Sequence, residues 1–183
     1  PIQHISDNVL KKMNRRTTKN EITNLIQKIR KEIPEVILRT SLIVGFPGET
    51  ESEFEELREF VEQAKFDKLG AFQYSKEEGT PAEKLPNQID EKIKKVRYNK
   101  IMRLQQKISN EKLKENIGKE YETLVEDITF DGKYLVGRTK NDVPDIDGLV
   151  YIENNNNEEK INKFVNVKIT DVSGYDLIGK LID

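Results

Sequence analysis

The sequence of 183 residues predicts an α/β region followed by a small all-β barrel. Up to about residue 116, stretches with helical spacing of apolar residues alternate with short runs of strand-forming residues. That order is typical of parallel strands joined by helical crossovers. After Gly118, short strand-like segments follow one another between turn residues. We therefore expect two domains, residues 1–116 and 117–183.

The first region carries clear helix-start signals. Ser6 has the residue type and position of a helix cap. Thr18 with Glu21, and Thr50 with Glu53, have the spacing of capping boxes, in which each side chain accepts a hydrogen bond from the other residue's backbone N–H group. These signals predict that three helices begin just after Ser6, Thr18 and Thr50.

Strands are expected between these helices. Residues 36–44 and 69–75 have the composition of strands, and residues 1–4 resemble the end of a third. A long helix is predicted at about 89–116, with its charged residues mostly in solvent. Two or three strands are too few to close a barrel, so we expect part of a (β/α) barrel. Such a part would expose a strand edge, and a dimer through that edge is one expected way to cover it.

The second region predicts a five-stranded barrel of OB-like size. Asp131 and Gly132 have the sequence of a hairpin turn. Val165, Val167 and Ile169 alternate with polar residues, which is the period of a half-buried strand. The expected strands are 121–128, 134–140, 148–153, 162–172 and 176–182.

Composition and charge restrict the classes of function. The chain is 35% hydrophobic and 35% charged, and no run approaches the ~20 apolar residues of a membrane-spanning helix. It has no cysteine and one histidine, which excludes thiolate and His-rich metal sites within this sequence. We expect a cytoplasmic protein with no membrane partner. The start at Pro1 rather than Met leads us to expect a piece of a larger protein.

Charge is distributed unevenly between the two regions. Residues 117–183 contain 8 Lys and Arg against 14 Asp and Glu, a net charge of −6, whereas residues 1–116 contain 23 against 19, a net charge of +4. Such asymmetry concerns partners rather than fold.

The stretch "LIVGFPGETESEF" (residues 42–54) raises the question of a phosphate-binding loop. Such loops present backbone N–H groups at a helix start, usually with a lysine nearby. Here Pro47 removes one N–H group, no lysine follows, and Glu49, Glu51 and Glu53 crowd the helix start. The carboxylates would repel a phosphate, so a well-capped turn between strand and helix is the stronger interpretation on local grounds.

The strand before this turn predicts a cavity. Arg39, Ser41, Ile43 and Gly45 share one strand face, and the opposite face is mostly aliphatic. Polar side chains inside a filled barrel would be costly unless paired, so we expect the first face to line a polar cavity at the carboxyl end of the strand. A flat uncharged group such as adenine could rest there against Ile43 and the glycine backbone.

Four ordered blocks carry a resemblance to a known family. They are "PIQHISDNVLKKMNR" (1–15), "RTSLIVGFPGETESEFEEL" (39–57), "FQYSKEEGTPA" (72–82) and "NDVPDIDGLVYI" (141–152). In this order they resemble the C-terminal part of radical SAM methylthiotransferases of the RimO type. The resemblance implies that the first region ends a partial TIM-like radical SAM barrel and that the second is a TRAM domain, which contacts the macromolecular substrate.

The resemblance also implies an activity and cofactors. RimO-type enzymes methylthiolate an aspartate of small-subunit ribosomal protein number twelve. They use S-adenosylmethionine and two [4Fe–4S] clusters, one on three cysteines of an N-terminal domain and one on a CxxxCxxC loop. This chain contains neither cysteine set. We therefore expect the transferase activity in the intact parent, and neither cofactor nor activity in this chain alone.

The family's site residues transfer by position. The motif of the family's fifth barrel strand, which packs beside the adenine, corresponds to Ile43, Gly45, Phe46, Pro47, Gly48 and Glu49. Two departures occur: Ser41 stands where the general pattern has glycine, and Glu49 lies one residue later than the usual Glu. Gln3 and His4 correspond to the end of the preceding strand, near the ribose.

Several of these residues have an alternative structural role. His4 would either touch the ligand or fix a backbone turn. Arg39 would line the cavity or form an internal salt bridge. Phe72 and Tyr74 fall in the motif of the last strand, and Tyr74 would contact the ligand or belong to the core.

The substrate could be a protein or an RNA. The related MiaB-type enzymes, which modify an adenosine of tRNA, resemble "QSGSD" where this chain has "QHISD" (residues 3–7). An RNA-binding TRAM domain should be basic, whereas this one is acidic. Both features favour a basic ribosomal protein over RNA, with Arg138, Asp145 and Asp147 as candidate contacts. A non-catalytic binding module is the alternative from another class.

Overall fold

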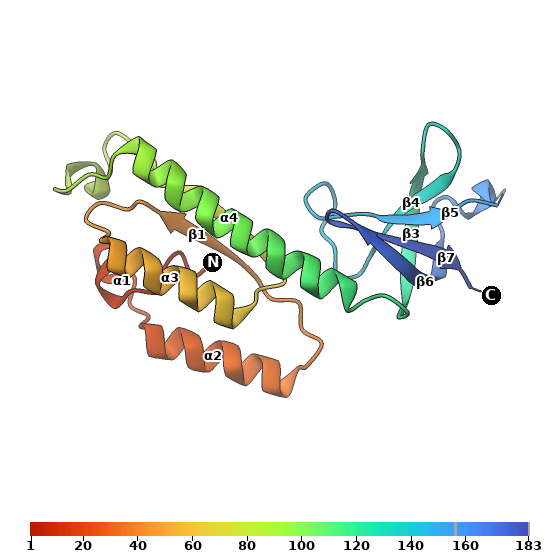
Figure 1. The fold of residues 1–183 in the computed structure, drawn as a ribbon, viewed down its shortest axis with the longest axis horizontal. Helices are drawn as coiled ribbons and strands as arrows, with labels where there is room; N and C mark the ends of the chain where they lie inside the picture. The colour runs from red at the N-terminus through yellow and green to blue at the C-terminus, as the bar shows by residue number, and fades with distance from the viewer. Residues whose placement is uncertain (156, 183) are drawn as a thin grey trace. The chain divides into compact units, whose positions relative to one another are not determined.

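A computed structural model describes residues 1–155 and 157–182 of the chain. It divides into two compact units, Pro1–Ile108 and Ser109–Asp183. Figure 1 shows most of the helices in the first unit and strands β3 to β7 in the second. Among the residues described, no helix is both long and apolar enough to cross a membrane.

The first unit is an α/β arrangement around two parallel strands. β1 and β2 pair in parallel, with Ile43 beside Phe72, and a helix forms the crossover between them. On its other side β1 receives a single bridge, from Gln3 to Leu42. This agrees with the expected part of a (β/α) barrel. The elements are α1 (Asp7–Lys12), α2 (Lys19–Glu32), β1 (Arg39–Val44), α3 (Glu51–Ala64), β2 (Lys68–Gln73), the short 3₁₀ helix η1 (Pro81–Lys84) and α4 (Glu91–Lys114).

The helix-start signals are confirmed. The Ser6 side chain accepts a hydrogen bond from the N–H group of Val9 at the start of α1. Thr18 with Glu21, and Thr50 with Glu53, form complete capping boxes at α2 and α3. The local sequence therefore fixes where these helices begin.

Two expected strands are shorter than predicted. β1 begins at Arg39 rather than at residue 36, because the N–H group of Val36 donates to the Ile33 carbonyl in a turn after α2, and the ladder with β2 begins at the pair Arg39 and Lys68. The N–H group of Leu38 donates to the Asp67 carboxylate, and its carbonyl accepts from the N–H groups of Asp67 and Lys68. Residues 1–4 form only the bridge at Gln3, whose φ of 68° interrupts extended backbone.

One face of β1 belongs to the core, as predicted. Thr40, Leu42 and Val44 are buried, whereas Ser41 and Ile43 on the other face are half-buried. The core around this strand draws on α1, α3, β2 and α4; its fully or almost fully buried members include Ile5, Leu10, Leu42, Val44, Phe54, Leu57, Val61 and Ile101.

The second unit contains a closed five-stranded barrel, as the sequence predicts. The strands are ordered β3-β4-β5-β7-β6 around it, antiparallel except for the parallel pair β5 and β7. Its core consists of Val125, Leu135, Val150, Ile152, Val167, Ile169 and Leu177. The strands are β3 (Glu120–Ile128), β4 (Tyr134–Thr139), β5 (Val150–Glu153), β6 (Phe164–Ser173) and β7 (Asp176–Leu181), with the 3₁₀ helix η2 (Glu158–Lys160) before β6.

Candidate functional site

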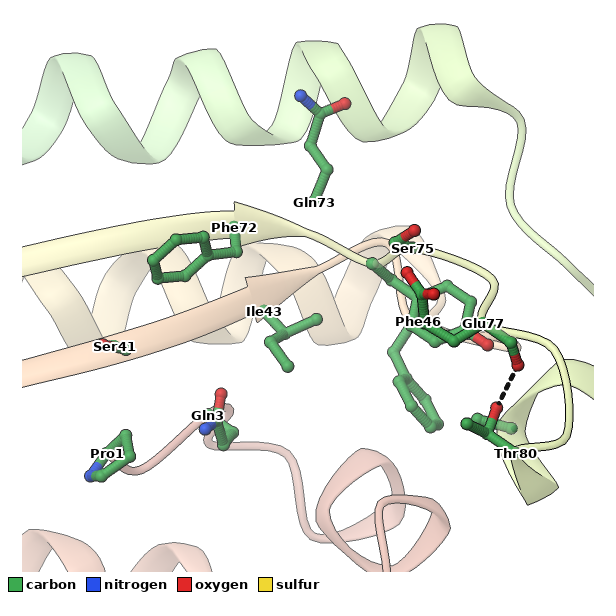
Figure 2. A pocket seen from close by; sticks show the side chains of 12 residues that line it. Pro1, Gln3, Ser41, Ile43, Phe46, Phe72, Gln73, Ser75, Glu77 and Thr80 are labelled. Atoms are coloured by element: carbon green, nitrogen blue, oxygen red, sulfur yellow. Dashed lines mark hydrogen bonds between the residues drawn. The ribbon is translucent and has the colours of Figure 1, made fainter.

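A cavity of about 490 Å³ opens in the first unit beside the half-buried face of β1. Figure 2 shows Ile43 of β1 between Gln3 and Phe46 in this cavity. The wall is largely apolar, with a few hydroxyl, amide and carboxylate groups. Its residues are Pro1, Gln3, Ser41, Ile43, Phe46, Phe72, Gln73, Tyr74, Ser75, Glu77, Thr80 and Ala82.

Strand alternation and register assemble the apolar wall. Residues at alternate positions of a strand share a face, so Ser41 and Ile43 both point away from the core. The parallel register places Phe72 of β2 next to Ile43. Immediately after β1 the chain turns, and the ring of Phe46 packs edge-on against that of Tyr74, with centroids 5.2 Å apart. Sequence segments from three parts of the first unit thus meet at one cavity.

The turn after β1 is held from beneath by a buried carboxylate. The Glu49 side chain is 0% exposed, and its Oε2 accepts hydrogen bonds from the N–H groups of Gly45 and Phe46. Its Oε1 accepts a bond of 3.0 Å from Nη1 of Arg97. Burial raises the pKa of Glu49, whereas Arg97 and the two N–H groups act in the opposite direction. Glu49 therefore fixes the backbone that carries Phe46.

Arg97 connects this turn to α4. Its Nη1 also donates to the backbone carbonyl of Glu49 at 3.1 Å, and its Nη2 donates to the carboxylate of Glu51 at 3.0 Å. Only 6% of the Arg97 side chain is exposed. A buried guanidinium that makes charge-assisted bonds to two carboxylates fixes their geometry strongly.

His4 lies beside the same carboxylate and is completely buried. Its Nδ1 accepts a hydrogen bond of 3.0 Å from the N–H group of Ser6, and its Nε2 lies 4.0 Å from Oε2 of Glu49. Burial lowers the pKa of His4 to about 4; the charge of Glu53 raises it and that of Arg97 lowers it further. His4 is therefore neutral near pH 7, so it forms no ion pair with Glu49 there.

Glu53 completes the polar cluster at the helix start. Partial burial raises its pKa, but hydrogen bonds from Thr50, Asn8 and Ser6 outweigh that effect and hold the pKa at about 2. Its carboxylate accepts bonds of 2.7 Å from Nδ2 of Asn8 and 3.1 Å from the Ser6 hydroxyl. The cluster thus ties α1 to the start of α3.

Four of the eight predicted cofactor-site residues line the cavity. They are Gln3, Ile43, Phe46 and Tyr74. The other four lie outside the lining residues: Arg39 is exposed at the start of β1, and His4, Gly45 and Glu49 belong to the turn and the polar cluster beneath it.

Gly45 meets α4 rather than the cavity. A side chain at this position would place its Cβ 2.4 Å from Cγ of Lys94, and the backbone has a φ of 75°. Both features require glycine. The Nζ of Lys94 in turn donates to the backbone carbonyl of Tyr74 at 3.0 Å and lies 5.1 Å from the centre of its ring. Close packing against α4 is therefore sufficient to explain this glycine.

Most charges of α4 lie in solvent, as expected, but two of them are buried. As whole residues, Lys94 and Arg97 are 2% and 5% exposed. They occupy the helix face that also carries Ile101, Gln105 and Ile108, all buried. This spacing of three and four residues could have predicted the burial of both cations from the sequence. A cation on the same helix face as buried residues is itself buried, and it then needs a polar partner.

Arg138, Asp145 and Asp147, the candidate substrate contacts of the second unit, differ in their surroundings. Arg138 of β4 donates to Oε1 of Glu126 at 2.8 Å. Asp145 is exposed in the loop between β4 and β5, with a φ of 61°. Asp147 in the same loop accepts a bond of 2.8 Å from the N–H group of Val143. Asp145 is thus the most accessible of the three.

The part of the chain that the structure describes contains no group of three or more His, Cys, Asp or Glu side chains arranged to hold a metal ion. The sequence also contains no cysteine. The cavity has the size and apolar wall of a small-molecule site.

Comparison with known proteins finds a match in each unit. Residues 1–61 match the radical SAM superfamily, and residues 117–182 match the TRAM domain. The whole chain is similar to proteins named ribosomal protein uS12 methylthiotransferase RimO. The protein from Alkaliphilus oremlandii is 58% identical, with 99% of this chain and 41% of that protein covered. Those from Clostridioides difficile and Geobacter sulfurreducens are 53% and 49% identical, each with 100% of this chain and 40% of the relative covered. The chain thus spans about two fifths of their length.

Proposed function

We propose that this chain, which belongs to the RimO-type radical SAM methylthiotransferases, forms the part of such an enzyme that closes the S-adenosylmethionine site and presents the TRAM domain to the substrate. The reaction would be methylthiolation of an aspartate of ribosomal protein uS12 in the cytoplasm. The observation that carries the proposal is the similarity of the chain, over 98–100% of its length, to several proteins of that name. In this proposal residues 1–116 close the S-adenosylmethionine site, and residues 117–183 form the TRAM domain.

The cavity beside β1 suits the adenosine part of S-adenosylmethionine. Its volume falls within the range of roughly 300–1,000 Å³ that is usual for small-molecule sites. Ile43 and Phe46 offer apolar contact to a flat base, and the amide of Gln3 offers polar contact to a ribose. In the intact enzyme, S-adenosylmethionine and two [4Fe–4S] clusters would supply the radical and sulfur chemistry. Because this chain has no cysteine, the clusters would be held by other parts of the enzyme, and the chain alone would be inactive.

Shortening Ile43 should weaken binding of S-adenosylmethionine. Ile43→Ala in the full-length enzyme removes apolar contact worth on the order of 1 kcal/mol, so we expect the dissociation constant to rise about fivefold to tenfold. Equilibrium dialysis with S-adenosylmethionine measures this. Leu25→Ala is the matched control, because Leu25 is 58% exposed on α2 and does not line the cavity. A dissociation constant within twofold of the wild type for Ile43→Ala would contradict the assignment of the cavity.

The charge of residues 117–183 supports a protein substrate. A net charge of −6 repels RNA phosphates at long range and attracts a basic ribosomal protein. Asp145 and Asp147 in the loop before β5, and Arg138 on β4, are the proposed contacts. A dimer through the outer edge of β2 is also part of the proposal, because β2 is an edge strand of the two-stranded sheet in the described part of the chain.

Measuring whether the chain binds uS12 or tRNA distinguishes a protein substrate from an RNA substrate. We expect the purified chain to bind uS12 and to bind tRNA weakly or not at all in the same buffer at physiological salt. Salt titration adds a second criterion, because RNA binding through phosphates would weaken steeply as salt rises. Tight binding of tRNA with such a slope would favour the MiaB-type alternative, and binding to neither would remove the support for a substrate-contacting TRAM domain.

A further inference from the structure

We infer that Phe130, at the tip of the β3–β4 hairpin, is an aromatic anchor through which the barrel holds its basic protein partner. This inference rests on the proposed function, because it names one residue of the surface that would contact uS12. The Phe130 side chain is 110% exposed, more than any other large apolar side chain in the described part of the chain. Ile146 and Phe164, the next most exposed, are at 71% and 66%.

Hydrogen bonds brace the backbone of the hairpin turn that carries Phe130. The Thr129 hydroxyl donates to Oδ1 of Asp131 at 2.8 Å, and the N–H group of Gly132 donates to the carbonyl of Thr129 at the same distance. Nδ2 of Asn154 donates to the carbonyl of Gly132 at 2.9 Å and so braces the turn from the segment after β5. A braced turn loses little backbone freedom when it binds, which favours affinity.

The charges around the ring argue against RNA as its partner. The β3–β4 hairpin, residues 120–139, contains two cations, and both are paired: Lys133 with Asp131 at 3.1 Å and Arg138 with Glu126 at 2.8 Å. An aromatic residue that stacks on a nucleobase normally works beside cations that bind the phosphates. The same hairpin contains five carboxylates against these two cations, so its net charge is −3, on a barrel region of net charge −6.

A basic protein fits this combination. Aromatic side chains are enriched at the centres of protein interfaces, and a few anchors supply most of the binding energy there. Carboxylates around such an anchor match a partner rich in Lys and Arg. Phe130 would insert between apolar groups of the partner while the surrounding carboxylates meet its cations.

The test uses the chain and purified uS12, with the dissociation constant measured by titration calorimetry. Phe130→Ala should weaken binding about tenfold, as expected for loss of an aromatic anchor. Phe130→Trp should bind within threefold of the wild type, because it retains an aromatic ring. Phe164→Ala is the matched control: it also removes a largely exposed phenylalanine from the barrel and should change affinity by less than twofold. Thermal unfolding should be unchanged by Phe130→Ala, because the fully exposed side chain is not packed in the core.

The outcomes distinguish this inference from the proposed function. If the wild-type chain binds uS12 and Phe130→Ala binds equally well, Phe130 is not an anchor and the proposed function stands. Equal losses for Phe130→Ala and Phe164→Ala overturn the inference as well, because they indicate a diffuse apolar effect. If the wild-type chain does not bind uS12, both fail. A loss of tRNA binding in Phe130→Ala, with uS12 binding unaffected, would assign the ring to RNA and overturn the inference.

Discussion

Replacing Arg97 with alanine is expected to lower the free energy of unfolding of the first unit by about 3–5 kcal/mol. The variant leaves the Glu49 carboxylate, which is 0% exposed, without its cation, and also removes the bond to the Glu49 carbonyl. An uncompensated buried charge costs far more than the lost attraction of a surface pair. Urea unfolding followed by circular dichroism measures the change.

Arg58→Ala is the control for this experiment. Arg58 pairs with Glu55 and Glu62 along α3, and its side chain is 33% exposed. Such pairs contribute only about 0–1 kcal/mol, so this variant should lose less than about 1 kcal/mol. If Arg97→Ala lost no more than Arg58→Ala, the buried network would not be what stabilises the turn after β1.

Replacing His4 with asparagine is expected to remove a pH dependence of stability. The pKa of His4 is about 4 in the folded protein because the ring is buried, against about 6.5 in the unfolded chain. Between these values the unfolded state binds more protons, so stability is complete above pH 6.5 and falls as the pH drops from 6.5 towards 4. Between about pH 7 and pH 5 the loss from His4 should be on the order of 2 kcal/mol.

Asparagine is chosen because its side-chain oxygen can accept the bond from the Ser6 N–H group, which Nδ1 of His4 accepts in the wild type, and because it does not titrate. Urea unfolding of both proteins at several pH values gives the comparison. The raised pKa of Glu49 changes stability with pH in the opposite sense, but it is present in both proteins and cancels in the difference. Parallel profiles for the wild type and His4→Asn would show that His4 titrates normally in the folded chain.

Much of the fold follows from local sequence signals. Capping residues such as Thr18 and Thr50 mark helix starts because the bonds that define a cap lie within four residues. Alternation likewise predicts which residues of β1 face the core, and the five strands of the second barrel are separated by turn residues that the sequence displays. Strand alternation therefore predicted that Ser41 and Ile43 of β1 face the cavity.

The rest of the site depends on contacts between distant segments. Glu49 meets Arg97, 48 residues later, and nothing in "GFPGET" indicates that a cation arrives from α4. The glutamate therefore resembles a cofactor contact in the sequence, whereas the structure places it beneath the turn. The bond from the Leu38 N–H group to Asp67, just before β1, is likewise a contact between distant segments.

The most direct test of the proposed function is the reaction of the full-length enzyme that contains this chain. The enzyme, with its iron–sulfur clusters reconstituted, would be incubated with S-adenosylmethionine, a reductant, sulfide and either uS12 or tRNA, and the products analysed by mass spectrometry. We predict that one aspartate of uS12 exchanges a hydrogen for a methylthio group and that tRNA is unchanged. Methylthiolation of a tRNA adenosine, with uS12 unmodified, would contradict the proposal.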